Sequence, residues 1–327
     1  MKKVLFTFSS GGIGHATRSL AIANYLKNKD TEIVFGGFGP GLELIKLNGF
    51  KVYELPQPKF FPLEKIKIKD LIKPYFQHRK EYLKLFREFR PDVHVCDMEL
   101  VSLIIGKIYA RYNFLITHEF KPFNFKLGFK GLLRKWIIRN KEVFADITFY
   151  TWIEDIPLKK NRRLVGLLAY EEPAKKLRGK NKILYIPTGT SKNDVNLSEI
   201  SKNIDATIYS RGYSGKNIKN IYKLKKVPNL FPYIKGVDLV ICSGYSSIME
   251  CIIARTPCIV LPNTVEQIEV AEKCKLKGLC EIASKEDLLD KVSKLLFDFR
   301  ARRNMIRKQK KLKNGAKEIA NFILSLE

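Results

Sequence analysis

Three glycines and a histidine near the start of the chain are the residues there whose types and spacing are best suited to ligand binding or catalysis. Gly11, Gly12 and Gly14 belong to the stretch SSGGIGH, which follows an apolar run and precedes a segment of helical periodicity. A glycine turn that leads into a helix offers free backbone N–H groups and the positive end of a helix dipole, so it suits an anion. His15 lies at the junction, and an imidazole can take up a proton near neutral pH. The alternative is a tight strand–helix turn with a packed or capping histidine.

The second half of the chain offers a matching set of small and hydroxyl residues. Thr188, Gly189 and Thr190 follow one apolar run, and the stretch SGYSS at 243–247 follows another and leads into a helix. Hydroxyl groups and N–H groups at a helix N-terminus can bind a diphosphate. The first loop, SSGGIGH, lacks both the G-x-G-x-x-G and the P-loop spacing. The turns of the second half are therefore the candidates for a diphosphate site.

Three further polar residues follow that second turn. Glu250 lies one turn inside the helix, where a carboxylate could accept bonds from ribose hydroxyls; the alternative is an ordinary acidic residue favoured by the helix dipole. Glu266 and Gln267 open the next helix, where they could contact sugar hydroxyls or act as a capping pair.

Strand-like apolar runs alternate with helical segments throughout the chain, which is the pattern of parallel sheets covered by helices. In the first half the expected strands include 4–9 and 93–96, and the first expected helix is 17–28. A charged segment containing Pro and Gly interrupts this alternation, which then restarts. We expect an α/β protein with two Rossmann-like parallel-sheet domains facing across a cleft. The expected divisions are an acceptor-binding domain at 1–165, a linker at 166–180, a donor-binding domain at 181–308, and a C-terminal helix at 309–327 that could pack back on the first domain.

The composition narrows the classes of protein and partner. Lys and Arg total 60 against 33 Asp and Glu, and this net charge of +27 favours an anionic partner or surface. We find no apolar run long enough to span a membrane and no signal peptide, and so expect a cytoplasmic protein. The histidines and cysteines have no metal-ligand spacing, so we expect buried reduced thiols, no metal site and no cofactor.

The stretch DLVICSGYSSIMECIIARTPCIVLPNTVEQIEVA at 238–271 resembles the donor-binding region of GT-B glycosyltransferases, closest to the MurG-like branch. The resemblance implies a nucleotide-sugar substrate, with UDP as the nucleotide. By position, Glu250 matches the glutamate that holds the ribose, and Val227 falls near the segment that holds the base. The donor-binding residues it implies are Thr188, Gly189, Thr190, Val227, Gly244, Ser246, Ser247, Glu250, Glu266 and Gln267.

The first half of the chain resembles the same branch. The loop SSGGIGHATR is similar to its glycine loop, ITHEF to its strand ending in His-Glu, and VCDMEL to a strand whose Asp lies near the reaction centre. The resemblance implies His15 as general base oriented by Asp97, with Glu119 as the competing base. Gly11, Gly12, Gly14 and His118 would then bind the acceptor.

The implied reaction is an inverting, metal-independent transfer of a sugar to a lipid-linked acceptor at the cytoplasmic face of the membrane. Residues 120–141 interleave basic and aromatic side chains, as a segment that binds anionic lipid would. Ile13 and Glu266 depart from the MurG pattern and keep a nucleotide-sugar hydrolase or epimerase of the same fold as an alternative. A basic membrane- or anion-binding protein without enzymatic activity is the third interpretation. We find no nucleic-acid-binding motif.

Overall fold

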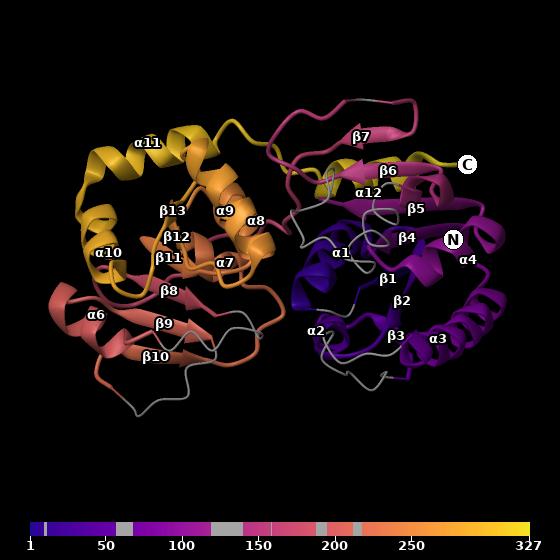
Figure 1. Ribbon diagram of the computed structural model, residues 1–327, viewed down its shortest axis with the longest axis horizontal. Coiled ribbons are helices and arrows are strands. Elements are labelled where there is room, and N and C mark those ends of the chain that lie inside the picture. Colours follow the sequence, from indigo (N-terminus) through magenta and orange to yellow (C-terminus); the bar gives the residue numbers. More distant parts are fainter. Residues whose placement is uncertain (10–11, 57–67, 119–139, 158, 188–194, 212–217) are drawn as a thin grey trace. The chain divides into compact units, whose positions relative to one another are not determined.

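The computed structural model describes residues 1–9, 12–56, 68–118, 140–157, 159–187, 195–211 and 218–327. The described chain forms two compact units, shown with their elements in Figure 1. Unit 1 contains the described residues of 1–118, 140–165 and 316–327, and unit 2 contains those of 166–315. Each unit is built around its own parallel sheet.

Unit 1 has seven described strands, all paired in parallel, in the order β3-β2-β1-β4-β5-β6-β7. The inner strands are continuous apolar runs because both faces of the sheet are covered. The order runs in one direction from β1 to β3 and in the other from β4 to β7, so it reverses between β1 and β4. The strands are β1 Lys2–Phe8, β2 Thr31–Gly37, β3 Lys51–Glu54, β4 Val93–Asp97, β5 Tyr112–Thr117, β6 Ile147–Tyr150 and β7 Arg162–Leu164.

The helices of unit 1 connect these strands. Helix α1 begins at Ile13, four residues before the expected start at Thr17, so His15 lies within its first turn. The C-terminal helix α12 belongs to unit 1 and packs against α1. The helices are α1 Ile13–Leu26, α2 Pro40–Leu47, α3 Ile68–Phe89, α4 Leu100–Tyr109 and α12 Ala316–Ser325, with a short 3-10 helix, η2, at Lys141–Phe144.

Unit 2 has six described strands, also parallel, in the order β10-β9-β8-β11-β12-β13. Its order reverses between β8 and β11, as that of unit 1 does between β1 and β4. The strands are β8 Ile183–Ile186, β9 Ile208–Arg211, β10 Ile221–Leu224, β11 Leu239–Cys242, β12 Cys258–Val260 and β13 Glu281–Ile282. The helices are α6 Leu197–Ile204, α7 Phe231–Lys235, α8 Tyr245–Ala254, α9 Val265–Leu276, α10 Leu288–Phe297 and α11 Phe299–Gln309.

The segment 166–180, expected as a linker, is part of unit 2. Leu167, Leu168 and Ala169 are buried, and the backbone of Leu167 pairs with the chain at 313–315. One side of the unit 2 sheet packs against α6, α10 and α11 in a single apolar cluster. All six cysteines of the chain are buried and free.

Two parallel sheets with connecting helices confirm the predicted α/β fold class. In each unit, the point at which the strand order reverses is where ligands bind in open α/β sheets, beyond the carboxyl ends of the strands. We call these two places the reversal points. Among the described helices, none is long and apolar enough to cross a bilayer.

Candidate active site

The reversal point of unit 1 brings together His15 and Asp97. His15 lies in the first turn of α1, directly after β1, and Asp97 is the last residue of β4. Phe8 at the end of β1 is in register with Asp97, so the two strands deliver the side chains to the same edge. His15 Nδ1 lies 2.8 Å from Asp97 Oδ1. The two residues that the sequence analysis assigned to proton transfer are thus in hydrogen-bond contact.

Arg18 joins this pair, and the sequence analysis did not assign it a role. Its Nε donates to Asp97 Oδ2 at 2.9 Å and its Nη2 donates to Asp97 Oδ1 at 2.6 Å, while both residues are almost completely buried. Burial alone would raise the pKa of Asp97, but the charges of Arg18 and then His15 hold it well below its ordinary value. The signal in the sequence was the spacing His15-Ala16-Thr17-Arg18, since residues three apart share one face of a helix.

His15 Nδ1 has two partners, and they ask for different positions of the imidazole proton. When Nδ1 carries the proton, it donates to Asp97 Oδ1 and the lone pair is left on Nε2. When Nδ1 carries the lone pair, it accepts from Arg18 Nη2, which lies 2.7 Å away and can only donate. The His15 side chain is 23% exposed, whereas Asp97 is fully buried. The imidazole can therefore act as a base toward a bound molecule while the carboxylate holds its orientation.

More basic groups lie at the ends of the neighbouring strands. His118 follows β5 and is buried, with its Nδ1 3.4 Å from Arg18 Nη1. Lys141, which the sequence analysis did not single out, is also buried and donates from Nζ to Thr117 Oγ1 at 2.7 Å. The carboxyl edge of β4 and β5 therefore brings together three buried basic side chains, those of Arg18, His118 and Lys141.

Gly12 precedes α1 as its N-cap residue. Its φ of 179° is extended backbone that any residue adopts, and a Cβ added there would meet nothing within 4 Å. Neither backbone conformation nor packing among the described residues requires glycine at this position. A glycine at position 12 would still be needed if a ligand approaches the backbone closely there.

The reversal point of unit 2 is formed by β11 and the N-terminus of α8. Gly244 is the N-cap of α8 and makes no side-chain cap, and Ser246 and Ser247 lie half-buried in the first turn. The Ser243 hydroxyl is buried and has no hydrogen-bond partner among the described residues. A helix start with open N–H groups and nearby hydroxyls can accept an anion.

Glu250 lies one turn further along α8. It is only 6% exposed, and burial raises the pKa of its carboxyl to about 7, with the charge of Arg211 opposing the shift. Arg211 is the last residue of β9, and burial lowers its pKa while Glu250 opposes that shift. Arg211 could not be identified from the sequence, because its proximity to Glu250 depends on how α8 packs against the sheet.

The polar pair at the start of α9 takes part in helix capping. Thr264 Oγ1 accepts from the Gln267 backbone N–H at 3.2 Å, and Gln267 Oε1 accepts from the Asn263 N–H at 2.9 Å. Thr264 is the N-cap and Gln267 bonds the N–H of the residue before it, so this is a variant of the capping box, and Gln267 alone has the capping role that was considered for the pair. The amide nitrogen of Gln267 can still donate to a ligand, and Glu266 stays half-buried beside it.

Several predicted positions lie outside the described residues. They are Gly11, Glu119, Thr188, Gly189, Thr190 and nearly all of 120–141. Gly14 is in the first turn of α1, and Val227 is half-buried in the segment after β10. Within the described chain no three His, Cys, Asp or Glu side chains are grouped so that they could hold a metal ion.

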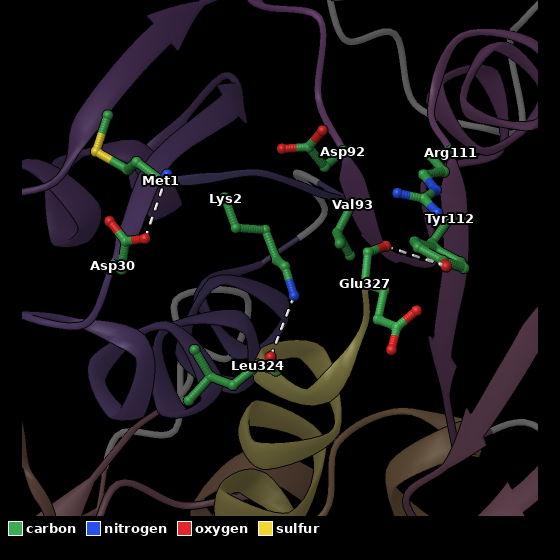
Figure 2. Close-up of a pocket in the computed structure, with 9 residues that line it drawn as sticks. All are labelled: Met1, Lys2, Asp30, Asp92, Val93, Arg111, Tyr112, Leu324 and Glu327. Carbon is green, nitrogen blue, oxygen red and sulfur yellow. Dashed lines mark hydrogen bonds and ion pairs between the residues drawn. The ribbon is translucent and has the colours of Figure 1, made fainter.

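A cavity of about 420 Å³ lies at the opposite, amino edge of the unit 1 sheet (Figure 2). Several of its charged groups bind one another or the backbone. The Met1 amino group pairs with Asp30, and Lys2 Nζ donates to carbonyl groups at the end of α12, including that of Leu324. The residues around this cavity therefore hold the end of α12 against the sheet, and the cavity is not a candidate active site.

Comparisons with known proteins bear on the activity and the fold of this chain. Residues 169–323 match the model of the glycosyltransferase family 28 C-terminal domain. An uncharacterized glycosyltransferase of Methanosarcina mazei is 25% identical over 314 residues, covering 80% of this chain and 79% of the relative.

Solved structures share the fold at low sequence identity. The spinosyn rhamnosyltransferase SpnG in complex with thymidine diphosphate superposes with a TM-score of 0.66 at 14% identity, over 98% of this chain and 100% of that one. MurG of Acinetobacter baumannii gives a TM-score of 0.65 at 14% identity, over 100% of both chains. The matched domain and the named relative show that the chain is a glycosyltransferase, and the solved structures show that its fold is the GT-B fold.

Proposed function

We propose that the enzyme transfers a sugar, with inversion and without a metal ion, from a UDP-sugar to a lipid-linked acceptor at the cytoplasmic face of the membrane. The observation that carries this proposal is the contact of 2.8 Å between His15 Nδ1 and Asp97 Oδ1 at the reversal point of unit 1. A base held in this way can take the proton of an attacking hydroxyl, which contributes roughly 10²–10⁴ in rate.

The donor binds at the reversal point of unit 2 in this proposal. The N-terminus of α8 and the hydroxyls of Ser246 and Ser247 hold the diphosphate and stabilise the charge that builds on it as it leaves. Glu250 accepts bonds from the ribose hydroxyls. The complex of SpnG with thymidine diphosphate supports a pyrimidine nucleoside diphosphate as the ligand class, because that protein has the same fold.

The acceptor binds at the reversal point of unit 1. Gly12 allows its close approach to the backbone, and the buried amine of Lys141 lies at the same edge, where it suits an acceptor carrying phosphate. The attacking hydroxyl then lies next to His15 Nε2. Bond formation at the anomeric carbon and departure of the nucleoside diphosphate occur in one displacement, so no sugar becomes attached to the protein.

Product analysis tests this function. The purified enzyme is incubated with a panel of nucleotide sugars, with and without a membrane lipid extract, and the products are identified by mass spectrometry. Transfer of one sugar to a lipid, dependent on the extract, is the expected result. Free sugar formed equally well without any acceptor would replace the proposal with nucleotide-sugar hydrolysis.

A further inference from the structure

Helix α11 of unit 2 presents an uninterrupted basic face to solvent. Its exposed positions recur at intervals of three and four residues, which is the spacing of one side of a helix. Met305 and Gln309, on the other side, are buried, and Gln309 Nε2 donates to the carbonyls of Thr256 and Leu279. The helix is thus fixed to unit 2 with one side outward. The exposed cations, which we call the α11 basic face, are Arg300, Arg303, Arg307, Lys310 and Lys311.

The cations of the α11 basic face form no ion pair with any described residue. Arg302, which points toward the unit, differs from them, because its Nη2 lies 3.9 Å from Asp238 Oδ1. No acidic residue occurs between positions 299 and 317. Asp298, just before the helix, accepts from the Ala301 N–H at 2.9 Å and so caps α11. The positive charge of this face is therefore uncompensated over about three helical turns.

Two exposed phenylalanines flank the start of this face. Phe297 ends α10 and is 59% exposed, and Phe299 begins α11 and is 68% exposed. By helical geometry Phe299 lies at the border of the same outward side as Arg303 and Lys310. Figure 1 shows this corner of α10 and α11 at the periphery of unit 2. Phenyl rings beside unpaired cations are the composition of a protein surface that binds at a membrane interface.

We propose that the α11 basic face and the two phenylalanines bind the surface of an anionic lipid bilayer. The cations are attracted to the anionic headgroups, and the phenyl rings enter the interfacial layer. One bilayer surface therefore binds both the cations and the rings. A polyanion without an apolar phase would use the cations and leave the rings in water. Single-stranded nucleic acid, which could stack on the rings, is the competing partner. This binding does not depend on the identity of the sugar donor or acceptor.

Vesicle binding by the full-length protein, without any substrate, tests the proposal. The vesicles contain either phosphatidylglycerol with phosphatidylcholine or phosphatidylcholine alone. One variant removes three charges from the α11 basic face: Arg300→Gln, Arg303→Gln and Arg307→Gln. The matched control removes three charges from exposed lysines elsewhere in unit 2: Lys202→Gln, Lys219→Gln and Lys225→Gln.

The α11 variant should bind anionic vesicles on the order of 100-fold more weakly, at roughly five-fold per cation, and the control should lose far less. A Phe297→Ser, Phe299→Ser variant should also bind anionic vesicles more weakly, and thermal unfolding confirms that each variant is folded. Equal losses in the α11 variant and the control would overturn the proposal. Tighter binding to single-stranded RNA than to anionic vesicles would assign the face to nucleic acid instead. Since no turnover is measured, failure here leaves the proposed glycosyl transfer standing.

Discussion

The reversal point of unit 1 contains charged groups joined by hydrogen bonds, whereas that of unit 2 contains a buried hydroxyl without a hydrogen-bond partner among the described residues and a buried carboxyl with a raised pKa. In unit 1, Asp97 accepts two bonds from Arg18 and contacts His15. In unit 2, the Ser243 hydroxyl is buried without a hydrogen-bond partner among the described residues, and the buried Glu250 carboxyl interacts with the charge of Arg211. The two units share one strand order, so the fold itself does not cause the difference.

The difference indicates a division of labour. A base must be held in one orientation before the substrate arrives, and the bonds among Arg18, Asp97 and His15 supply that order. Buried polar groups without partners are costly, so a site that contains them is completed when a ligand provides the missing bonds. Unit 1 thus has the features of a preassembled catalytic site, and unit 2 has those of a site that is satisfied by its ligand.

The largest expected effect is on turnover when the base of unit 1 is removed. His15→Ala should lower turnover by about 100- to 10,000-fold, because the attacking hydroxyl loses its proton acceptor. Donor affinity, measured by calorimetric titration, should stay within about two-fold, since we place the donor in unit 2. Thr17→Ala, on the next turn of α1, is the matched control. Full turnover by His15→Ala would move the base to another residue, with Glu119 the next candidate.

The second prediction concerns the stability of the preassembled cluster. Arg18→Met leaves the buried Asp97 carboxylate without its main partner, so the unfolding free energy of unit 1 should fall by about 3–5 kcal/mol. Arg18→Met combined with Asp97→Asn removes both charges and should recover more than half of that loss. Denaturant unfolding, followed by hydrogen exchange in β4, measures both effects. Equal destabilisation by the single and double variants would mean that the cluster is held by packing and not by charge.

The third prediction is that acid affects the two units in opposite directions. In unit 1, burial lowers the pKa of His94 to about 4, and its neutral ring bonds to Asn113 Oδ1 and Thr7 Oγ1. Below pH 6.5 His94 binds a proton in the unfolded chain but stays neutral in the folded protein. The unfolding free energy of unit 1 should therefore fall by about 3 kcal/mol as the pH falls to 4. In unit 2, the raised pKa of Glu250 means that the folded state holds a proton that the unfolded state releases. The unfolding free energy of unit 2 should therefore rise by about 3 kcal/mol as the pH falls from 7 to 4.5.

Calorimetry of the wild type against His94→Gln and Glu250→Gln isolates these two contributions. Taking the difference between each variant and the wild type removes other titrations, such as that of Glu99, whose pKa is raised by burial. The pH dependence of unit 1 should flatten in the first variant and that of unit 2 in the second. If both variants changed the same transition, the units would not unfold separately and the comparison would fail.

Much of the architecture could be predicted from the sequence because buried parallel strands are continuous apolar runs, such as those ending at Phe8 and Cys242. The meeting of His15 and Asp97 also follows from the alternation of strands and helices, since neighbouring parallel strands end at one edge. The role of Arg18 depends on where helix α1 begins. If α1 began at Thr17, as expected, His15 would belong to a loop. Because α1 begins at Ile13, His15 and Arg18 lie on one face of the helix.

Other parts of the site depend on long-range packing that no local pattern encodes. Arg211 and Glu250 are 39 positions apart, and their interaction arises only when α8 packs against the sheet that contains β9. The bonds of Gln267, in contrast, were available in the sequence as Thr264-x-x-Gln267, the pattern of a capping box. A glutamine at the start of a helix can therefore cap the helix or contact a sugar, and the sequence alone does not distinguish the two roles.

The smallest expected effect tests whether unit 2 is completed by its ligand. With a pKa of about 7, Glu250 is roughly one-tenth ionised at pH 6 and nine-tenths ionised at pH 8. Ribose hydroxyls donate to the carboxylate, so the affinity for a UDP-sugar should rise about ten-fold between these pH values. A UDP-sugar is the right probe because its diphosphate, substituted at both ends, does not titrate in this range. Glu250→Gln should bind the donor more weakly at pH 8 and should lose the pH dependence.

Two further variants make this test specific. Arg211→Gln removes the charge that favours ionisation of Glu250, so the midpoint of the affinity profile should move above pH 7. Glu272→Gln, an exposed acid on the neighbouring helix α9, should keep the profile of the wild type. An affinity that fell with rising pH would mean that the ligand binds the protonated carboxyl as a donor. Glu250 would then recognise an acceptor atom of the ligand, and the ribose hydroxyls would have to be bound elsewhere in unit 2.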